Sequence, residues 1–152
     1  MRVTIRAAHP QDAKAISGLI RETLGLPVSA SETAHVLARL CLSPRSRVFC
    51  AVVDDLTVGF LHVSDYDTIL MREPLKVVTA MAVARSYRRV GIGTALLKRA
   101  ERWASECGAA GVVLHAGYGR ETEAFFAACG YTAELPGPQF RKALALAPGT
   151  DG

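Results

Sequence analysis

An apolar strand, a glycine turn and an amphipathic helix follow one another between Val77 and Cys107, and this unit constrains the fold more than any other stretch. The segment Val77–Val83 has almost no polar residue, which is typical of a central strand covered on both faces. Gly91 and Gly93 then open a helix with clear amphipathic periodicity. Glycines let the backbone approach a ligand closely, and the N–H groups at a helix start favour an anion. The sequence therefore predicts a phosphate-binding turn here.

The basic residues of the chain gather around this turn. Six basic residues and one acid lie between Arg85 and Arg102, so this segment carries +5, whereas the whole chain carries +4. Arg88 and Arg89 precede the helix and are harder to explain as a solvated helix face than the basic residues that follow. Nucleic-acid binding would require a broader basic surface with interleaved aromatic residues. We therefore expect an anionic ligand at the turn and no nucleic-acid partner.

The composition is that of a folded protein. With 152 residues, of which 50% are hydrophobic and 21% charged, the chain is expected to form one domain, at residues 1–146, followed by a frayed tail at residues 147–152. No apolar run approaches the roughly 20 residues that span a bilayer, and the N-terminus lacks the apolar segment of a signal peptide. The expectation is a cytoplasmic protein without a membrane partner.

The cysteines stand far apart in apolar segments, and they lack the C-x-x-C spacing of metal and redox sites. This pattern predicts buried free thiols, no disulfide framework and no metal site. The residues concerned are Cys41, Cys50, Cys107 and Cys129.

Hydrophobic periodicity divides the chain into strands and helices without an internal repeat or linker. The predicted order is one strand, two helices, three strands, a helix, a strand, a helix and two strands, which favours a mixed α/β sheet. Strands are expected at Arg2–Ala7, Val48–Val53, Val58–Ser64, Val77–Val83, Gly111–Ala116, Tyr131–Leu135 and Phe140–Leu146. Helices are expected from Pro10 to Leu24, from a Ser29–Glu32 capping box to a residue before Pro44, from Gly91 to Gly108, and around Ala124–Ala128. The segment Ser64–Pro74 is interpreted as a loop.

Two common glycine motifs do not fit the turn. A dinucleotide-binding fingerprint needs a third glycine where this chain has Leu96, and a nucleoside-triphosphate P-loop needs a lysine where it has Thr94. The remaining pattern, Arg88-x-x-Gly91-x-Gly93 after an apolar strand, resembles the acyl-CoA pyrophosphate loop of the GNAT family of N-acetyltransferases. The order of elements and the run Ala-Phe-Phe-Ala-Ala-Cys-Gly-Tyr near the C-terminus also fall where that family has them. The resemblance implies one domain with a mixed, mostly antiparallel sheet of about seven strands flanked by about four helices.

The resemblance also implies how acetyl-CoA would bind. The main chain of the central strand would pair with the pantetheine arm as if the arm were an added strand, and N–H groups of the turn would hold the pyrophosphate. The central strand must then separate from the Gly111–Ala116 strand to leave room. The residues implied in cofactor binding are Met81, Ala82, Val83, Arg88, Arg89, Val90, Gly91, Ile92, Gly93 and Thr94.

The familiar acid and base positions of the family are occupied here by residues without that chemistry. Phe126 stands where many members have a tyrosine that can return a proton to the leaving thiolate. Thr79 and Leu114 correspond to glutamates that some members use as general base, and Gly119 corresponds to a frequent asparagine. Titratable residues near the expected cleft are His62, Asp65, Asp67, Glu73 and His115, each of which also fits an ordinary packed or solvated side chain. Our candidates for catalysis among them are Glu73 and His115.

From this resemblance we expect an acetyl-CoA-dependent N-acetyltransferase that acts on a primary amine of a small molecule or peptide. Since no cysteine stands in a credible setting for a nucleophile, we expect direct attack of the amine in a ternary complex, without a covalent acyl-enzyme. A non-catalytic acyl-CoA-binding or sensing domain of the same fold is the alternative. The identity of the amine is left open, and so is assembly into a homodimer.

Overall fold

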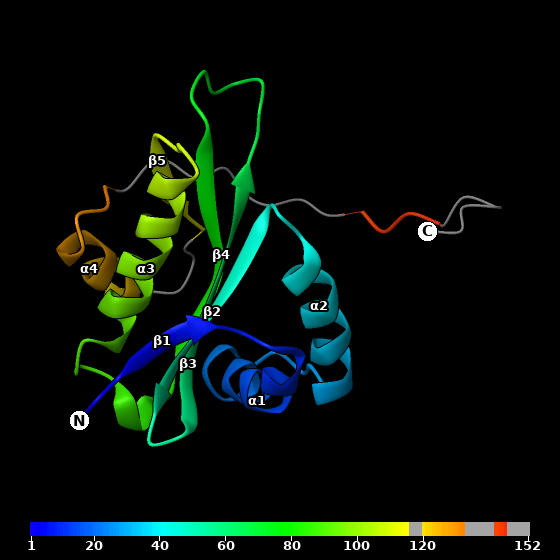
Figure 1. Ribbon diagram of the computed structural model, residues 1–152, viewed down its shortest axis with the longest axis vertical. Helices are drawn as coiled ribbons and strands as arrows, with labels where there is room; N and C mark the ends of the chain where they lie inside the picture. Colours follow the sequence, from blue (N-terminus) through cyan, green and yellow to red (C-terminus); the bar gives the residue numbers. More distant parts are fainter. Residues whose placement is uncertain (116–119, 133–141, 146–152) are drawn as a thin grey trace. The chain divides into compact units, whose positions relative to one another are not determined.

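A five-stranded sheet forms the centre of the larger of two compact units (Figure 1). The computed structural model describes residues 1–115, 120–132 and 142–145, and the two units are Met1–Gly117 and Tyr118–Gly152. The strands are β1 (Thr4–Ala7), β2 (Ser46–Val53), β3 (Leu56–Tyr66), β4 (Leu75–Val83) and β5 (Gly111–Leu114). The helices are α1 (Ala13–Leu24), α2 (Ala30–Leu42), α3 (Ile92–Glu106) and, in the second unit, α4 (Arg120–Ala128), with short 3₁₀ turns η1 (Pro10–Asp12) and η2 (Arg85–Tyr87).

The strands lie side by side in their order along the chain, β1-β2-β3-β4-β5. The first four pair antiparallel with their neighbours, whereas β5 pairs parallel with β4 after the chain has passed through α3. A parallel pair needs such a crossover, because the chain must return to the same end of the sheet. The prediction of a mixed, mostly antiparallel sheet with flanking helices is confirmed.

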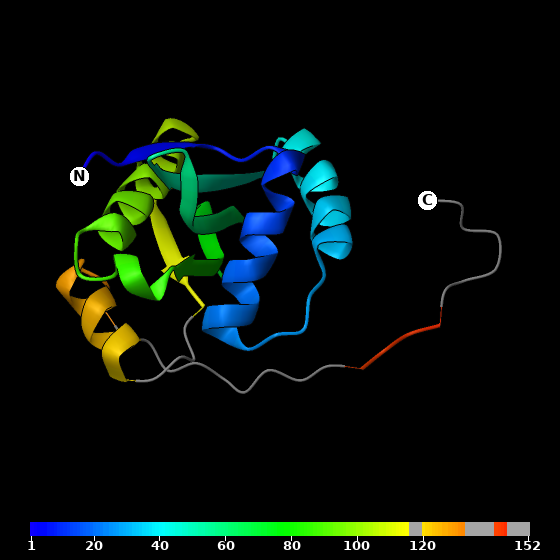
Figure 2. The same ribbon diagram turned by 90° about the horizontal axis from the view of Figure 1, so that it is seen from below.

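Helices cover both faces of the sheet in the first unit (Figure 2). On one face, Ile16 and Leu19 of α1 and Leu37 of α2 pack in a core with Cys50 and Phe60 of the sheet. On the other face lies α3, which buries Ile92, Leu96, Leu97, Ala100, Trp103 and Ala104. β4 runs between these two layers and buries Val77, Val78 and Ala82, whereas Leu75, Ala80, Met81 and Val83 are only partly buried, so the prediction of a strand covered on both faces holds in part.

Local signals set the ends of the first two helices. The Ser29 hydroxyl accepts a hydrogen bond from the Glu32 N–H at 3.0 Å, and the Glu32 carboxylate accepts one from the Ser29 N–H at 3.3 Å. This confirms the predicted capping box at the start of α2. Gly25 follows α1 with a φ of 67°, a left-handed conformation that glycine adopts without a steric penalty.

The hairpin between β2 and β3 is tighter than its sequence suggested. Asp54 and Asp55 adopt left-handed φ angles of 49° and 63°, and β3 already begins at Leu56, two residues before its predicted start at Val58. A two-residue turn with positive φ matches the twist of the paired strands, and aspartate tolerates this conformation better than most residues.

Polar residues extend β3 past its predicted end at Ser64. Asp65 and Tyr66 were expected in a loop, but both belong to the strand. Asp65 forms an ion pair with Lys76 on the neighbouring β4 and lies 3.9 Å from Arg45. Opposite charges on adjacent strands stabilise a sheet, and this pairing has no signature in a hydrophobic pattern.

The second unit contains the predicted helix before Gly130. In α4 the rings of Phe125 and Phe126 lie 5.5 Å apart, and Phe126 lies 6.4 Å from the ring of Tyr131. Of the two predicted final strands, residues 131, 132 and 142–145 are described and belong to no strand, and the rest lie outside the described residues. The predicted tail at residues 147–152 and Gly119 also lie outside them.

Within the described residues, no helix is long and apolar enough to cross a membrane. The same part of the chain contains no group of His, Cys, Asp or Glu side chains arranged to hold a metal ion.

The cysteines differ in burial, which corrects the prediction that all are buried. Cys50 lies fully inside the sheet, and burial raises the pKa of its thiol to about 12. Cys41 and Cys107 are free and exposed, because they lie at the C-terminal ends of α2 and α3, past the turns that pack on the sheet.

In the native protein, iodoacetamide is expected to modify Cys41 and Cys107 and to leave Cys50 unmodified until the chain unfolds. The reagent attacks the thiolate, and Cys50 has neither access nor a low enough pKa to supply it. Mass spectrometry of peptides labelled with and without denaturant measures this. Labelling of Cys50 in the folded protein as fast as that of Cys107 would contradict its buried position.

An ion pair connects β1 to the start of α1. Two guanidinium nitrogens of Arg6 donate to the Asp12 carboxylate at 2.8 and 2.9 Å, and the His9 N–H donates to it at 2.8 Å. The hydrogen bonds from Arg6 lower the pKa of the nearly buried Asp12. The ionised carboxylate therefore stabilises the fold above the unfolded-state pKa of about 3.9, and this contribution is lost as the pH falls through the lowered folded-state pKa.

Asp12→Asn is expected to lower the free energy of unfolding by about 1 to 3 kcal/mol at neutral pH. The difference from wild type should shrink as the medium is acidified below about pH 4, because the wild-type carboxyl then becomes protonated too. Urea unfolding followed by circular dichroism at both pH values tests this. Asp67→Asn, at an exposed acid, is the control with an expected change below about 0.5 kcal/mol. An equal loss in Asp12→Asn at neutral and acidic pH would argue against the ion pair.

Candidate functional site

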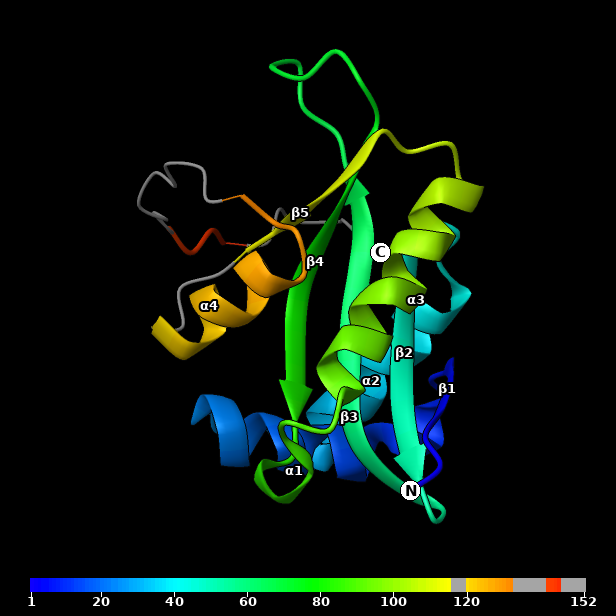
Figure 3. The ribbon, with the colours of Figure 1, turned by 90° about the vertical axis from the view of Figure 1, so that its left-hand side faces the viewer.

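The strands β4 and β5 separate halfway along β4 (Figure 3). They pair only from Leu75↔Gly111 to Val78↔Leu114, and the last contact between them is the His115 N–H donating to the Val78 carbonyl at 3.2 Å. Beyond this point β4 continues to Val83. The edge of β4 that faces β5 therefore has no strand partner among the described residues after Val78, as the resemblance required.

A β-bulge stands at the point of separation. The register between β3 and β4 shifts from Val63↔Val78 to His62↔Ala80, which leaves Thr79 as the extra residue of β4. A bulge bends its strand and increases its twist. The bulge therefore coincides with the point at which β4 and β5 stop pairing.

The glycine turn lies at the end of the unpaired half of β4. After η2, Arg89 adopts a φ of 64° and Gly91 a φ of 88°, and α3 begins at Ile92 with Gly91 as its N-cap. The cap provides no side-chain hydrogen bond to the first turn of the helix. Left-handed residues next to a helix start gather backbone N–H groups on one side and, with the positive end of the helix dipole, favour an anion. The predicted phosphate-binding turn thus has the backbone geometry of an anion site.

The basic residues near the turn have different roles. Arg88 and Arg89 are exposed at the turn, and the Arg88 Nε donates to the Val83 carbonyl at 3.2 Å. Arg85 instead donates to the Glu22 carbonyl at 3.0 Å, at the end of α1. Further along α3, Arg99 lies over the ring of Phe49, 4.6 Å from its centroid. The charge available to a ligand at the turn is therefore concentrated on Arg88 and Arg89.

Of the two candidates for catalysis, His115 lies at the fork between β4 and β5. It follows β5 directly, its side chain is exposed, and its ring meets that of Tyr66 edge to face at 6.2 Å. Glu73 is exposed two residues before β4 begins, at the end of β4 opposite to the glycine turn. Within the described residues no hydrogen bond or ion pair joins Glu73 to His115, whose ring instead meets Tyr66, the partner of Leu75 at the start of β4.

Side chains that sequence reasoning did not connect meet at the bulge. Thr79 Oγ1 lies 3.0 Å from His62 Nδ1, and His62 Nε2 lies 3.4 Å from Ser46 Oγ. His62 stood among the titratable residues of the expected cleft, but its partners depend on strand register and on the bulge. Asp65, also considered there, is held in its ion pair with Lys76.

Parallel strands that separate beside a glycine turn at a helix start are the arrangement that the resemblance to acyl-CoA-dependent acyltransferases implied. Residues 15–131 match the acetyltransferase (GNAT) family model, and the chain belongs to this family. It is an acetyl-CoA-dependent N-acetyltransferase by family. The comparison with curated proteins gives no match.

Solved structures of acetyltransferases share the fold at low sequence identity. The aminoglycoside N-acetyltransferase AAC(6')-Iy in complex with CoA has a TM-score of 0.80 and 17% identity, over 94% of this chain and 96% of that one. An aminoglycoside acetyltransferase from an uncultured soil metagenomic sample, in complex with sisomicin, has a TM-score of 0.77 and 22% identity, over 94% and 97%. The ribosomal-protein-alanine N-acetyltransferase from Brucella melitensis biovar Abortus 2308 has a TM-score of 0.76 and 21% identity, over 93% and 100%.

Proposed function

We propose that this protein transfers the acetyl group of acetyl-CoA to a primary amine of a small molecule or peptide, by direct attack in a ternary complex. The observation that carries the proposal is the unpaired edge of β4 after Val78, which ends at the glycine turn. An extended ligand with amides along its arm and phosphates at its base matches a free strand edge followed by an anion site.

In this proposal acetyl-CoA lies along the second half of β4. Its pantetheine arm pairs with the main chain of Met81, Ala82 and Val83, and its pyrophosphate binds N–H groups of residues 89–94. Arg88 and Arg89 supply positive charge beside the phosphates. Although the Val83 carbonyl already accepts a hydrogen bond from Arg88, a carbonyl oxygen has a second lone pair for a pantetheine amide.

Three cysteines give no support to a covalent acyl-enzyme. The Cys50 thiol is buried with a raised pKa, and Cys41 donates to the Ala8 carbonyl at 3.4 Å at the end of α2. Cys107 follows α3, a helix of 15 residues whose other end is the glycine turn. At a rise of about 1.5 Å per residue, its thiol lies roughly 20 Å from the turn. These positions support direct attack on the thioester.

The structures with the same fold suggest which amines to try first. Two of them act on aminoglycosides, and one acts on an alanine of a ribosomal protein. The acceptor in our proposal is accordingly a primary amine on an amino sugar or a peptide N-terminus. A proton must leave this amine, and His115 at the fork and Glu73 before β4 are the candidate bases from the sequence.

Release of free CoA thiol in the presence of amines tests the proposal. We expect turnover of acetyl-CoA with at least one member of a panel that contains sisomicin, a peptide beginning with alanine, a lysine-containing peptide and a polyamine. Mass spectrometry of the product should show one added acetyl group on the amine. Chain denatured by heat provides the background rate.

The alternative is a non-catalytic acyl-CoA-binding or sensing domain. It is favoured by Thr79, Leu114 and Phe126, which occupy positions where relatives carry an acid or base. Tight binding of acetyl-CoA in calorimetry, combined with no turnover across a wide amine panel, would support it over the transferase.

A further inference from the structure

Three polar side chains form a row across adjacent strands at the fork between β4 and β5. Thr79 belongs to β4, His62 to β3 and Ser46 to β2, with distances of 3.0 Å from Thr79 Oγ1 to His62 Nδ1 and 3.4 Å from His62 Nε2 to Ser46 Oγ. His62 and Ser46 lie on the face of the sheet that α1 and α2 cover. His62 pairs with Val48 and stands two residues from Phe60 on the same face of β3, and both Val48 and Phe60 belong to that core. Ser46 stands two residues from Val48 on β2. The row is therefore a continuous path of donors and acceptors within one layer.

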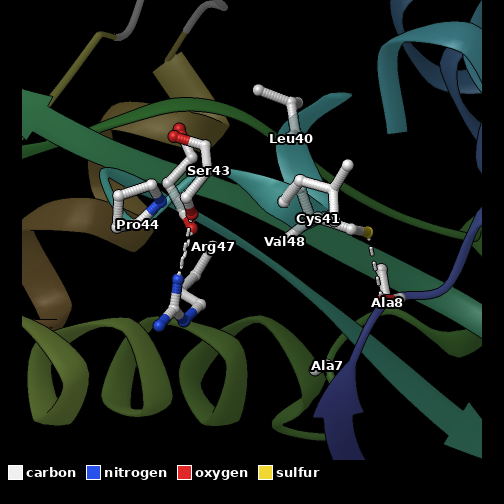
Figure 4. A pocket seen from close by; sticks show the side chains of 10 residues that line it. Ala7, Ala8, Leu40, Cys41, Ser43, Pro44, Arg47 and Val48 are labelled. Atoms are coloured by element: carbon white, nitrogen blue, oxygen red, sulfur yellow. Dashed lines mark hydrogen bonds between the residues drawn. The ribbon is translucent and has the colours of Figure 1, made fainter. Parts of the chain in front are cut away.

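The two ends of this row differ. Thr79 is the first residue of β4 beyond the last β5 contact, at the edge where the acyl group of acetyl-CoA would lie in the proposed function. At the other end, Ser46 is buried but lines a cavity of about 300 Å³ between the end of α2 and the start of β2. Figure 4 shows Arg47 directed at Ser43 on one side of this cavity and Cys41 directed at Ala8 on the other. The cavity is open to the surface and has Ser43 and Arg47 among mainly apolar lining residues, so the Ser46 end of the row borders a space that solvent can enter.

On the basis of the proposed transferase function, we infer that His62 is the general base and accepts the proton of the attacking amine through the hydroxyl of Thr79. The family position that carries a glutamate in some members holds Thr79 here, and a hydroxyl oxygen alone is too weak a base to keep an additional proton. It can pass one on, because it donates and accepts at the same atom. The hydrogen bond from Thr79 to an imidazole supplies the missing basic group.

The environment of His62 fits this role. Burial lowers its pKa, so the imidazole is neutral near neutral pH and has one nitrogen free to accept a proton. In the required tautomer, Nε2–H donates to Ser46 Oγ and Nδ1 accepts from the Thr79 hydroxyl. After proton transfer both ring N–H groups donate to hydroxyl oxygens, which stabilises the imidazolium.

The step is balanced as follows. The lone pair of the neutral amine forms the C–N bond at the thioester carbonyl, and the C–S bond breaks with its electron pair on sulfur, so that CoA leaves as thiolate. The nitrogen gives one proton to Thr79 Oγ1 while the original hydroxyl proton of Thr79 moves to His62 Nδ1. The imidazolium returns this proton to solvent after the amide product leaves.

Four variants test the inference with the panel amine that gives the highest kcat/KM. Thr79→Val, which keeps the shape but removes the hydroxyl, and His62→Gln are each expected to reduce kcat about 100-fold, the lower end of the usual contribution of a general base. The KM for acetyl-CoA should remain within about twofold, and Thr79→Ser should retain most of the wild-type kcat, because it restores the hydroxyl. His35→Gln, at an exposed histidine of α2, is the matched control with unchanged kcat.

Other outcomes overturn the inference in distinguishable ways. If the wild-type protein turns over but Thr79→Val and His62→Gln keep kcat within about threefold, His62 is not the base. A large loss of kcat in a parallel His115→Asn variant would then identify His115 as the base. A loss of acetyl-CoA binding in calorimetry equal to the loss of kcat would show a structural defect only. Absence of turnover by wild type with every amine overturns the transferase function together with the relay.

A spectroscopic measurement tests the same inference without turnover. In ¹⁵N-resolved NMR of the imidazole rings, His62 should be the Nε2–H tautomer at neutral pH, and Thr79→Val should shift its Nδ1 signal. An Nδ1–H tautomer in the wild-type protein would overturn the relay, because Nδ1 could not then accept a proton.

Discussion

Replacing Gly91 by valine is expected to weaken acetyl-CoA binding at least tenfold. Gly91 is the N-cap of α3 with a φ of 88°, a region in which a β-branched residue is strongly strained. Apart from its neighbours along the chain, no atom of the described residues lies within 4 Å of the position a Cβ would take, so the substitution meets no clash there. The expected damage has two causes, a distorted turn and a side chain that stands where the phosphates approach the backbone.

A matched control is available at the opposite end of the same helix. Gly108 has a φ of 77° and also has no atom within 4 Å of a built Cβ, so Gly108→Val introduces a similar backbone strain. Calorimetric titration with acetyl-CoA should show an increase in Kd of at least tenfold, or about 1.4 kcal/mol, for Gly91→Val and little change for Gly108→Val. Equal affinity in the two variants would refute the assignment of the glycine turn to the cofactor.

Trp103→Ala is expected to cost about 3 to 5 kcal/mol of unfolding free energy, the largest loss of stability that we predict for one substitution. Trp103 of α3 is 5% exposed and packs on the sheet. Two cations lie over its ring, Lys76 of β4 at 4.7 Å and Arg47 of β2 at 5.4 Å from the centroid. The alanine variant would lose both cation–π contacts and leave a cavity under the helix.

Guanidinium unfolding followed by far-ultraviolet circular dichroism measures this loss. Fluorescence cannot be used for the variant, because Trp103 is the one tryptophan of the chain. Trp103→Phe retains an aromatic ring for the two cations and should lose about half as much stability. If alanine and phenylalanine proved equally destabilising, the ring contacts with Lys76 and Arg47 would have no measurable role.

Sequence patterns were sufficient for the elements that local chemistry determines. The capping box at Ser29, the glycine after α1 and the apolar stripe of α3 each specify a helix boundary or a buried face without help from distant residues. The glycine turn belongs to the same group, since its basic residues and its helix start are neighbours in the chain. The prediction that this turn binds the cofactor rests on these local signals.

The part of the site proposed to transfer the proton depends on contacts between strands, which a single sequence does not specify. Thr79 and His62 are 17 positions apart, and they meet because β3 and β4 pair in one register and because the bulge leaves Thr79 as an extra residue. The prediction of a loop after Ser64 failed for the same reason, since Asp65 is stabilised in the strand by Lys76. Hydrophobic periodicity indicates which side chains of one strand or helix are buried, but it does not indicate which residues of other strands they contact.

The bulge at Thr79 also reverses the parity of β4. Before it, the odd-numbered Val77 shares a face with Ser64 and His62, whereas after it the even-numbered Ala80 and Ala82 lie on that face. If Thr79 were instead paired as an ordinary residue of the ladder, strict alternation would turn the following side chains over and exchange the alanines under α1 and α2 for the bulkier Met81 and Val83. Because of this one extra residue, the face of β4 under α1 and α2 has a valine before the bulge and only alanines after it.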